Sequence, residues 1–336
     1  MKIAACFSSR ADYAPLYPVI SELEKRGAEV IQLNLDVGLM KDDTPLSCSL
    51  SLIKGMRYLA AALSYENPDI VLLLGDRYET LGAAQIATLF QIPIAHIHGG
   101  ETTEGSFDNE FRHAITQLAT YHFAATEESA QRIYDMTGNK NVELVGAPGL
   151  DNINDLPPRE IAQPYFLVTY HPPTKREFDE IALVDALNEA HGVDALNEAH
   201  GFAVVWTGVN NDPGKERIFR AFNRRLVTPD PPGTMPVKKY LSYMKYASCC
   251  IGNSSSFLIE APALGVPSVN VGDRQKGRLH GPSVFDVPED RDQIVRAIRK
   301  ALAYKGPFDN PYGGPGASKK IADILMPNPT SQSEAA

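Results

Sequence analysis

Residues 92–119 read IPIAHIHGGETTEGSFDNEFRHAITQLA and carry polar side chains at a density that no hydrophobic core would tolerate. The apolar run 92–97 predicts a buried strand, and the apolar spacing over 109–119 predicts an amphipathic helix. Four carboxylates, three histidines and one arginine lie on the connection between them: Glu101, Glu104, Asp108, Glu110, His96, His98, His113 and Arg112. Because open α/β sheets place their sites at the carboxyl ends of strands, we predict that this connection is the chemical centre.

The rest of the chain alternates short apolar runs with helical patterns. Before residue 150, strands are expected at 3–7, 30–34, 70–74, 92–97, 122–125 and 143–145, with helices at 15–26, 46–65, 79–90, 109–119 and 128–136. Near-continuous apolar strands joined by helices are typical of a parallel sheet that is covered on both faces.

A proline-containing segment at 154–163 interrupts this pattern, which then restarts. Strands are expected at 165–170, 202–207, 248–251 and 268–271, and helices from 175 and at 215–226, 237–247, 255–264 and 291–303. We therefore predict two Rossmann-like α/β domains that face a central cleft. The expected divisions are an N-terminal domain (1–160), a C-terminal domain (165–310), a C-terminal helix (311–326) and a disordered tail (327–336).

Composition excludes some classes of function. The formal net charge of −9 is a poor match for the phosphate backbone of nucleic acid. No apolar run approaches the roughly 20 residues of a membrane span, and the start of the chain does not have the form of a signal peptide. We expect a cytoplasmic protein in which the four cysteines are buried, reduced thiols.

A tandem duplication stands between the first two expected strands of the second domain. Residues 184–192 read VDALNEAHG, and an identical copy follows at 193–201. At about 100° per residue, nine residues turn a helix face through roughly 180°, so both copies cannot use one buried stripe. We expect a break at Gly192 and structural tolerance of the insertion.

A second polar loop is expected where residues 248–260 read SCCIGNSSSFLIE. A strand, a small polar loop and a helix start present backbone N–H groups and hydroxyls, which suit a phosphate or pyrophosphate. Plain capping of the helix by serine is the alternative. Glu260, placed to accept hydrogen bonds from ribose hydroxyls, and the basic residues within 272–278 favour a nucleotide diphosphate site.

Other strand ends carry candidate residues whose roles stay open. Asp76 follows a buried strand, where an aspartate serves catalysis or caps the next helix. Arg10 follows the first strand, with no Gly-x-Gly-x-x-Gly motif to indicate a dinucleotide. His171, held between Tyr170 and two prolines, occupies the equivalent place in the second domain, and a structural role is equally consistent with it.

His96 and His98 project from one face of a strand, and with nearby carboxylates they suggest a metal-dependent hydrolase as an alternative. A metal site would need further ligands at a defined spacing, so we favour no metal. A third alternative is a nucleotide-sugar binding protein without turnover, because the duplication could displace part of the second domain's site. The apolar faces over 83–90 and 109–119 are compatible with a homo-oligomer, although burial in the core explains them equally well.

Taken together, these residues resemble the UDP-N-acetylglucosamine 2-epimerase family over about residues 1–305, and more closely its hydrolysing branch in sialic and legionaminic acid synthesis. The resemblance is carried by Gly75-Asp-Arg77, His96-Ile-His-Gly-Gly-Glu101, Glu104-Gly105, Asp108, Arg112-His-Ala-Ile-Thr116, His171-Pro-x-Thr174, Asn210-x-Asp212-x-Gly214, Gly252-Asn-Ser-Ser-Ser256, Glu260, Gly272 and Arg274. It implies a two-domain fold of the glycosyltransferase-B type.

The resemblance also implies roles for individual residues. The catalytic candidates are Asp76, Glu101, Asp108, Glu110 and His171, and the substrate-binding candidates are Arg10, His98, Arg112, Asn210, Gly252, Asn253, Ser254, Ser255, Glu260 and Arg274. The implied reaction uses neither cofactor nor metal. It eliminates UDP from UDP-N-acetylglucosamine to give a glycal and adds water to release N-acetylmannosamine. A UDP-linked 2,4-diacetamido-trideoxyhexose and a GDP-linked sugar are the alternative substrates.

Overall fold

The computed structural model describes residues 1–36, 44–173, 177–191, 202–208, 214–225 and 235–327. The chain divides into two compact units. The first unit comprises Met1–Glu101, Asp108–Asn152 and Tyr312–Ala336, and the second comprises Thr102–Phe107 and Ile153–Pro311. The short segment Thr102–Phe107 therefore groups with the second unit, although its flanking residues belong to the first.

The first unit contains, within the described ranges, a six-stranded sheet in the order β2-β1-β3-β4-β5-β6. All paired strands are parallel, with Ile3 opposite Ile70 at the centre of the sheet. The strands are β1 (Lys2–Phe7), β2 (Glu29–Asn34), β3 (Ile70–Leu74), β4 (Ile94–Ile97), β5 (Tyr121–Ala124) and β6 (Val142–Leu144). The helices are α1 (Arg10–Lys25), α2 (Pro45–Glu66), α3 (Tyr78–Leu89), α4 (Asp108–Leu118), α5 (Glu127–Thr137), the 3-10 turn η1 (Pro148–Asn152) and α11 (Ala317–Leu325).

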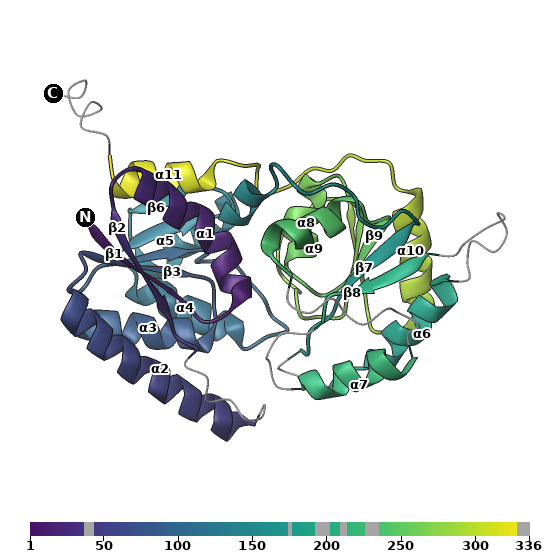
Figure 1. Cartoon of the computed structure of the whole chain (residues 1–336), viewed down its shortest axis with the longest axis horizontal. Coiled ribbons are helices and arrows are strands. Elements are labelled where there is room, and N and C mark those ends of the chain that lie inside the picture. Colours follow the sequence, from purple (N-terminus) through teal and green to yellow (C-terminus); the bar gives the residue numbers. More distant parts are fainter. Residues whose placement is uncertain (37–43, 174–176, 192–201, 209–213, 226–234, 328–336) are drawn as a thin grey trace. The chain divides into compact units, whose positions relative to one another are not determined.

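Alternate residues of the central strands supply two cores, because successive side chains of a strand point to opposite faces. Ile3 and Ile70 pack with Leu16 of α1 and Ile321 of α11 on one face. Ala4 and Val71 pack with residues of α2, α3 and α4 on the other. Figure 1 shows α11 beside α1, so the end of the chain completes the first unit.

The second unit contains, in the part of the chain that is described, a five-stranded parallel sheet in the order β11-β10-β9-β7-β8. The strands are β7 (Tyr165–Thr169), β8 (Ala203–Trp206), β9 (Cys249–Gly252), β10 (Ser268–Val271) and β11 (Val284–Val287). The helices are α6 (Glu180–His191), α7 (Lys215–Arg225), α8 (Val237–Lys245), α9 (Ser256–Ala263) and α10 (Arg291–Ala303). Phe166 and Val168 face α6, α7 and α10, whereas Tyr165 and Leu167 face α8 and α9.

Both sheets share one topology, and it determines where a site can form. The strand order changes direction between β1 and β3 in the first unit and between β7 and β9 in the second. In open α/β sheets, the loops that follow such strands diverge to opposite faces, and ligands bind in the crevice between them. The loops after β1, β3 and β4, and those after β7 and β9, are the ones that the sequence singled out.

The first copy of the duplicated nonapeptide lies in α6, where Val184, Ala186, Leu187 and Ala190 are buried. That helix ends at His191, and the expected break at Gly192 and the second copy lie outside the described residues. The expected tail beyond residue 327 does so too. Cys6, Cys249 and Cys250 are buried free thiols as predicted, while Cys48 is partly exposed. No helix in the described ranges is long and apolar enough to cross a membrane.

Candidate active site

Asp76 follows β3 and meets a fully buried arginine. Arg112 from α4 is 0% exposed and places its guanidinium against the Asp76 carboxylate. The same guanidinium donates a hydrogen bond from Nη1 to the carbonyl oxygen of Glu101, at 3.0 Å. Arg112 therefore ties the ends of the neighbouring strands β3 and β4 together. The cap of α3 is Arg77, without a side-chain hydrogen bond, so Asp76 is not the capping residue that the sequence allowed as an alternative.

His96 fixes the turn that carries Asp76. Its Nε2 lies 2.8 Å from the carbonyl oxygen of Gly75, a residue with a φ of +84°. Burial lowers the pKa of His96 to about 4, so the ring is neutral at neutral pH and its proton sits on Nε2 to donate this bond. His96 therefore holds the backbone of Gly75, the residue that precedes Asp76, by a hydrogen bond.

His98 and Glu101 form a buried pair at the start of the loop after β4. Nδ1 of His98 lies 2.5 Å from Oε1 of Glu101, and the side chains are 9% and 3% exposed. His98 has a φ of +63°, which few residues other than glycine adopt. Backbone strain of this kind is concentrated at functional sites.

The helix α4 presents only some of its candidate residues to this site. Asp108 begins the helix and lies one turn before Arg112, on the same face. Glu110 is exposed and lies about 200° around the helix from Asp108. The structure thus brings Asp76, Glu101 and Arg112 together, with Asp108 on the same helix face as Arg112, and leaves Glu110 pointing elsewhere.

The loop after β1 adjoins the loop after β3. Ser9 and Asp12 form a capping box at the start of α1, and Ser8 donates to the same aspartate at 2.8 Å. The Asp12 carboxylate lies 3.9 Å from Nε of Arg77. Arg10 is the first residue of α1, at the change in strand direction, but its side chain is outside the described part of the structure.

In the second unit, Asn253 joins the loops after β7 and β9. Its Oδ1 accepts from the backbone N–H of His171, and its Nδ2 donates to the His171 carbonyl, both at 2.7 Å. Asn253 is 1% exposed and His171 is 6% exposed. The amide side chain thus joins the loops at the carboxyl ends of β7 and β9.

Two further side chains reach the same loop from beyond β10. Arg274 and Gln275 donate to the carbonyl oxygen of Asn253 at 3.2 and 3.0 Å. Sequence reasoning selected Arg274 and missed Gln275, which is 3% exposed. Its position directly after Arg274, in a run of polar residues following a buried strand, was the available signal.

The serines of the loop are not occupied in capping α9. Ser255 precedes this helix and makes no side-chain capping hydrogen bond, so plain capping does not explain it. Ser254 contacts Ser256 through their hydroxyl groups at 2.8 Å. Glu260 lies within α9 and is partly buried. Asn210, the remaining candidate, lies outside the described residues.

The segment Thr102–Phe107 connects Glu101 and Asp108 and belongs to the second unit. The N–H of Glu104 donates to the carbonyl of Lys276 at 2.9 Å. A Cβ on Gly105 would lie 2.0 Å from the carbonyl oxygen of Asp273, so this close approach requires glycine. The residues that follow β10 therefore hold the loop that connects the two candidate acids Glu101 and Asp108.

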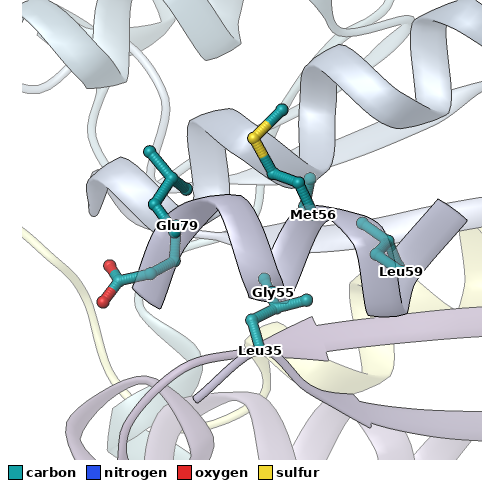
Figure 2. A pocket seen from close by; sticks show the side chains of 7 residues that line it. Leu35, Gly55, Met56, Leu59 and Glu79 are labelled. Carbon is teal, nitrogen blue, oxygen red and sulfur yellow. The ribbon is translucent and has the colours of Figure 1, made fainter. Parts of the chain in front are cut away.

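Two other features offer no site for a nucleotide sugar. Among the described residues, no group of three or more histidine, cysteine, aspartate or glutamate side chains is placed to hold a metal ion. Figure 2 shows a small pocket beside Leu35, Met56 and Leu59, with the Glu79 carboxylate pointing away from the apolar side chains. Its empty volume of about 190 Å³ is below the usual size of a ligand site.

Solved structures define the class of fold. The chain matches the crystal structure of Methanocaldococcus jannaschii UDP-GlcNAc 2-epimerase in complex with UDP-GlcNAc and UDP with a TM-score of 0.80, at 18% identity, over 98% of this chain and 100% of that one. The Neisseria meningitidis UDP-GlcNAc 2-epimerase bound to UDP-GlcNAc gives a TM-score of 0.77 at 20% identity, over 98% of this chain and 100% of that one. The fold is the two-domain α/β architecture of the glycosyltransferase-B type that the sequence predicted.

Sequence comparison gives the family. The profile described as UDP-N-acetylglucosamine 2-epimerase matches residues 21–326. The polysialic acid biosynthesis protein P7 of Escherichia coli is 35% identical over 73% of this chain and 66% of that protein. The UDP-N,N'-diacetylbacillosamine 2-epimerase (hydrolyzing) of Legionella pneumophila is 31% identical over 98% of this chain and 96% of that protein. The chain belongs to the UDP-N-acetylglucosamine 2-epimerase family, and the predicted resemblance is confirmed.

Proposed function

We propose that this protein is a hydrolysing 2-epimerase that converts a UDP-linked N-acetylhexosamine and water into the free 2-epimeric sugar and UDP. The observation that carries the proposal is the buried Arg112, which holds Asp76 and the Glu101 backbone at adjoining strand ends. A relative matched over 96% of its length is named as a hydrolysing enzyme, which supports the hydrolytic outcome.

The chemistry explains why a cluster of carboxylates is needed. Carbon 2 of a hexosamine has no adjacent carbonyl, so its proton becomes acidic only as the C1–oxygen bond to UDP breaks. A base takes the C2 proton, the C–H electron pair forms the C1=C2 bond of a glycal, and the C1–O pair leaves with UDP. Water then adds its oxygen to C1, and a proton is delivered to C2 on the opposite face. These steps are redox-neutral and require no redox cofactor.

Two carboxylates in different surroundings suit the two proton transfers. Asp76 is held by a fixed guanidinium, which orients its carboxylate for the role of base. Glu101 shares a short hydrogen bond with the buried His98, which positions its carboxyl group for proton delivery to the other face. Asp108 is the further candidate, on the helix face of Arg112. We leave Glu110 out of the proposed machinery because it is exposed on another side of α4.

The second unit is proposed to hold the nucleotide. Departure of UDP develops negative charge on the diphosphate, which preorganised donors stabilise. The proposed diphosphate contacts in this unit are the backbone of Gly252 and Asn253, the hydroxyls of Ser254 and Ser255, and the side chains of His171 and Arg274, with Glu260 proposed for the ribose. Arg10 of the first unit and Asn210 stay predicted substrate contacts. Of the described members of this set, His171, Asn253 and Arg274 are already joined by hydrogen bonds.

The test is release of UDP and of free sugar from UDP-N-acetylglucosamine, followed by chromatography. We expect wild-type turnover, and loss of at least about a thousandfold in Asp76→Asn and His171→Ala, because each removes a group proposed to act in the reaction. Asp323→Asn, on the far helix α11, serves as the matched control and should turn over normally. Near-normal turnover in both Asp76→Asn and His171→Ala would contradict the proposal, provided that circular dichroism shows both variants to be folded.

The identity of the hexosamine is the remaining alternative. The Legionella relative, named for UDP-N,N'-diacetylbacillosamine, matches this chain over nearly its whole length, so that sugar is the second candidate substrate. The Campylobacter jejuni relative is named for both GDP and UDP forms and is 29% identical over 77% of this chain. Parallel assays with UDP-N-acetylglucosamine and with the UDP- and GDP-diacetylbacillosamine pair rank the three by kcat/KM.

A further inference from the structure

A line of hydroxyl groups runs inward from the proposed diphosphate loop of the second unit. Ser254 Oγ lies 2.8 Å from Ser256 Oγ, which lies 2.6 Å from the phenol oxygen of Tyr240 on α8. The phenol also hydrogen bonds to Thr169, at the end of β7. Thr169 Oγ1 in turn lies 2.7 Å from Thr207 Oγ1, at the end of β8. Five hydroxyl groups thus connect the loop after β9 to two other strand ends.

The proton count of this line allows several arrangements. Each hydroxyl has one proton to donate and can accept from both neighbours, so the protons can all point inward, all point outward, or converge on one member from both sides. In the inward arrangement the last proton goes from Thr207 to the Val168 carbonyl, at 3.3 Å. In the outward arrangement that long bond is given up, and the Ser254 proton faces out of the loop.

A diphosphate selects the outward arrangement because its oxygens only accept hydrogen bonds. The phenol of Tyr240 is the middle member, and it transmits the order from Thr169 to Ser256. Burial raises the pKa of Tyr240 above its usual value, so the phenol stays protonated and can donate at any working pH. Without it, Ser256 loses its inner partner, and the Ser254 proton can turn to Ser256 instead of to the ligand.

We propose that Tyr240 is a positioning residue for the diphosphate, holding Ser256 and Ser254 so that the Ser254 hydroxyl donates to a phosphate oxygen. The inference rests on the proposed function, in which the loop after β9 binds the diphosphate of a UDP-sugar. It adds a residue outside the serine motif, contributed by a different helix.

The variant Tyr240→Phe removes only the phenol oxygen and keeps the ring in its core of apolar side chains. Binding of UDP and of uridine is measured by calorimetry and by competition. UDP should bind about fivefold more weakly, the effect of one lost hydrogen bond, whereas uridine affinity should not change. The double variant with Ser254→Ala should bind UDP no more weakly than Ser254→Ala alone, because Tyr240 acts through that serine.

Tyr165→Phe is the matched control. Tyr165 belongs to the same core and donates its phenol proton to the backbone of Tyr243, away from the serine loop. Its loss should lower thermal stability and leave UDP affinity unchanged.

The outcomes separate cleanly. Unchanged UDP affinity in a folded Tyr240→Phe protein overturns the inference, and so does an equal loss of UDP and uridine affinity, which would indicate a structural role. If that variant does not fold, Ser256→Ala breaks the same line and takes over the same comparison, with the same two results. Wild-type protein that fails to bind UDP overturns the proposed function together with this inference.

Discussion

Replacing Asn253 by aspartate tests how the second unit builds its crevice. The side chain keeps its size, and Oδ1 still accepts from the N–H of His171. The amide that donates to the His171 carbonyl at 2.7 Å becomes an oxygen, so two acceptors face each other in a buried place. One hydrogen bond is lost, and a buried carbonyl is left opposite an anion.

The expected magnitude follows from these two effects. A lost hydrogen bond costs about 1 kcal/mol, and leaving its buried partner unsatisfied costs about 1–3 kcal/mol more. A loss of about 3 kcal/mol corresponds to a fall in Tm of roughly 6–12 °C for a unit of this size. UDP affinity should fall as well, by about tenfold or more, because the loop that carries the serines keeps only one of its two hydrogen bonds to His171 and is held less firmly.

Thermal unfolding by circular dichroism and UDP calorimetry measure both consequences. Asn310→Asp is the control, since Asn310 donates its amide to the Ile259 carbonyl at 2.8 Å, in the same unit but away from the crevice loops. It should lose stability and keep its UDP affinity. An Asn253→Asp protein that melts within about 2 °C of wild type and binds UDP equally well would show that Asn253 does not hold these two loops together.

Three other perturbations probe the remaining parts of the account. Arg112→Lys keeps the positive charge but loses the guanidinium that contacts both Asp76 and the Glu101 carbonyl. The kcat should therefore fall at least about tenfold with UDP affinity unchanged, and equal losses of kcat and UDP affinity would contradict this. The pKa of His96 is about 4 in the folded protein and near 6.5 in the unfolded chain, so the unfolded chain binds the proton first as pH falls. The free energy of unfolding should therefore decline between about pH 6.5 and 4, by up to about 3 kcal/mol. Urea unfolding between pH 7 and 4.5 should show this decline, and His96→Gln should flatten it. Deletion of residues 193–201 leaves Gly192 and Phe202 to join α6 to β8, which is a common length for such a connection. The Tm should not fall and turnover should be retained. A destabilised protein would show that the second copy is part of the fold.

The fold was accessible from sequence because its strands are near-continuous apolar runs. Residues 70–74, predicted as a strand, form β3 without a shift at either end, and α10 has its predicted bounds. The strand β11 was not predicted, since Val284 and Val287 enclose Phe285 and Asp286 in a run too short and too polar to stand out. The helix α1 begins earlier than predicted because the capping box at Ser9 and Asp12 starts it before its apolar stripe.

The candidate site could be predicted only in part from the sequence, because no local sequence pattern indicates its long-range contacts. Arg112 stays a predicted substrate contact, and only the structure shows that it is completely buried against Asp76, a partner on another element. Gln275 and Tyr240 belong to no motif, and only tertiary contact brings them to the serine loop. Glu110 was selected because it lies in a polar run, whereas the turn of the helix directs it away.

The proposed hydrolytic epimerisation can be followed by proton NMR of the purified protein with UDP-N-acetylglucosamine in deuterated water, with UDP-N,N'-diacetylbacillosamine in a parallel sample. We expect free UDP, the free 2-epimeric sugar from at least one of the two substrates, and deuterium at C2, because the proton removed by the enzyme is replaced from solvent. Release of UDP with hydrogen retained at C2, or an epimerised sugar still attached to UDP, would contradict it.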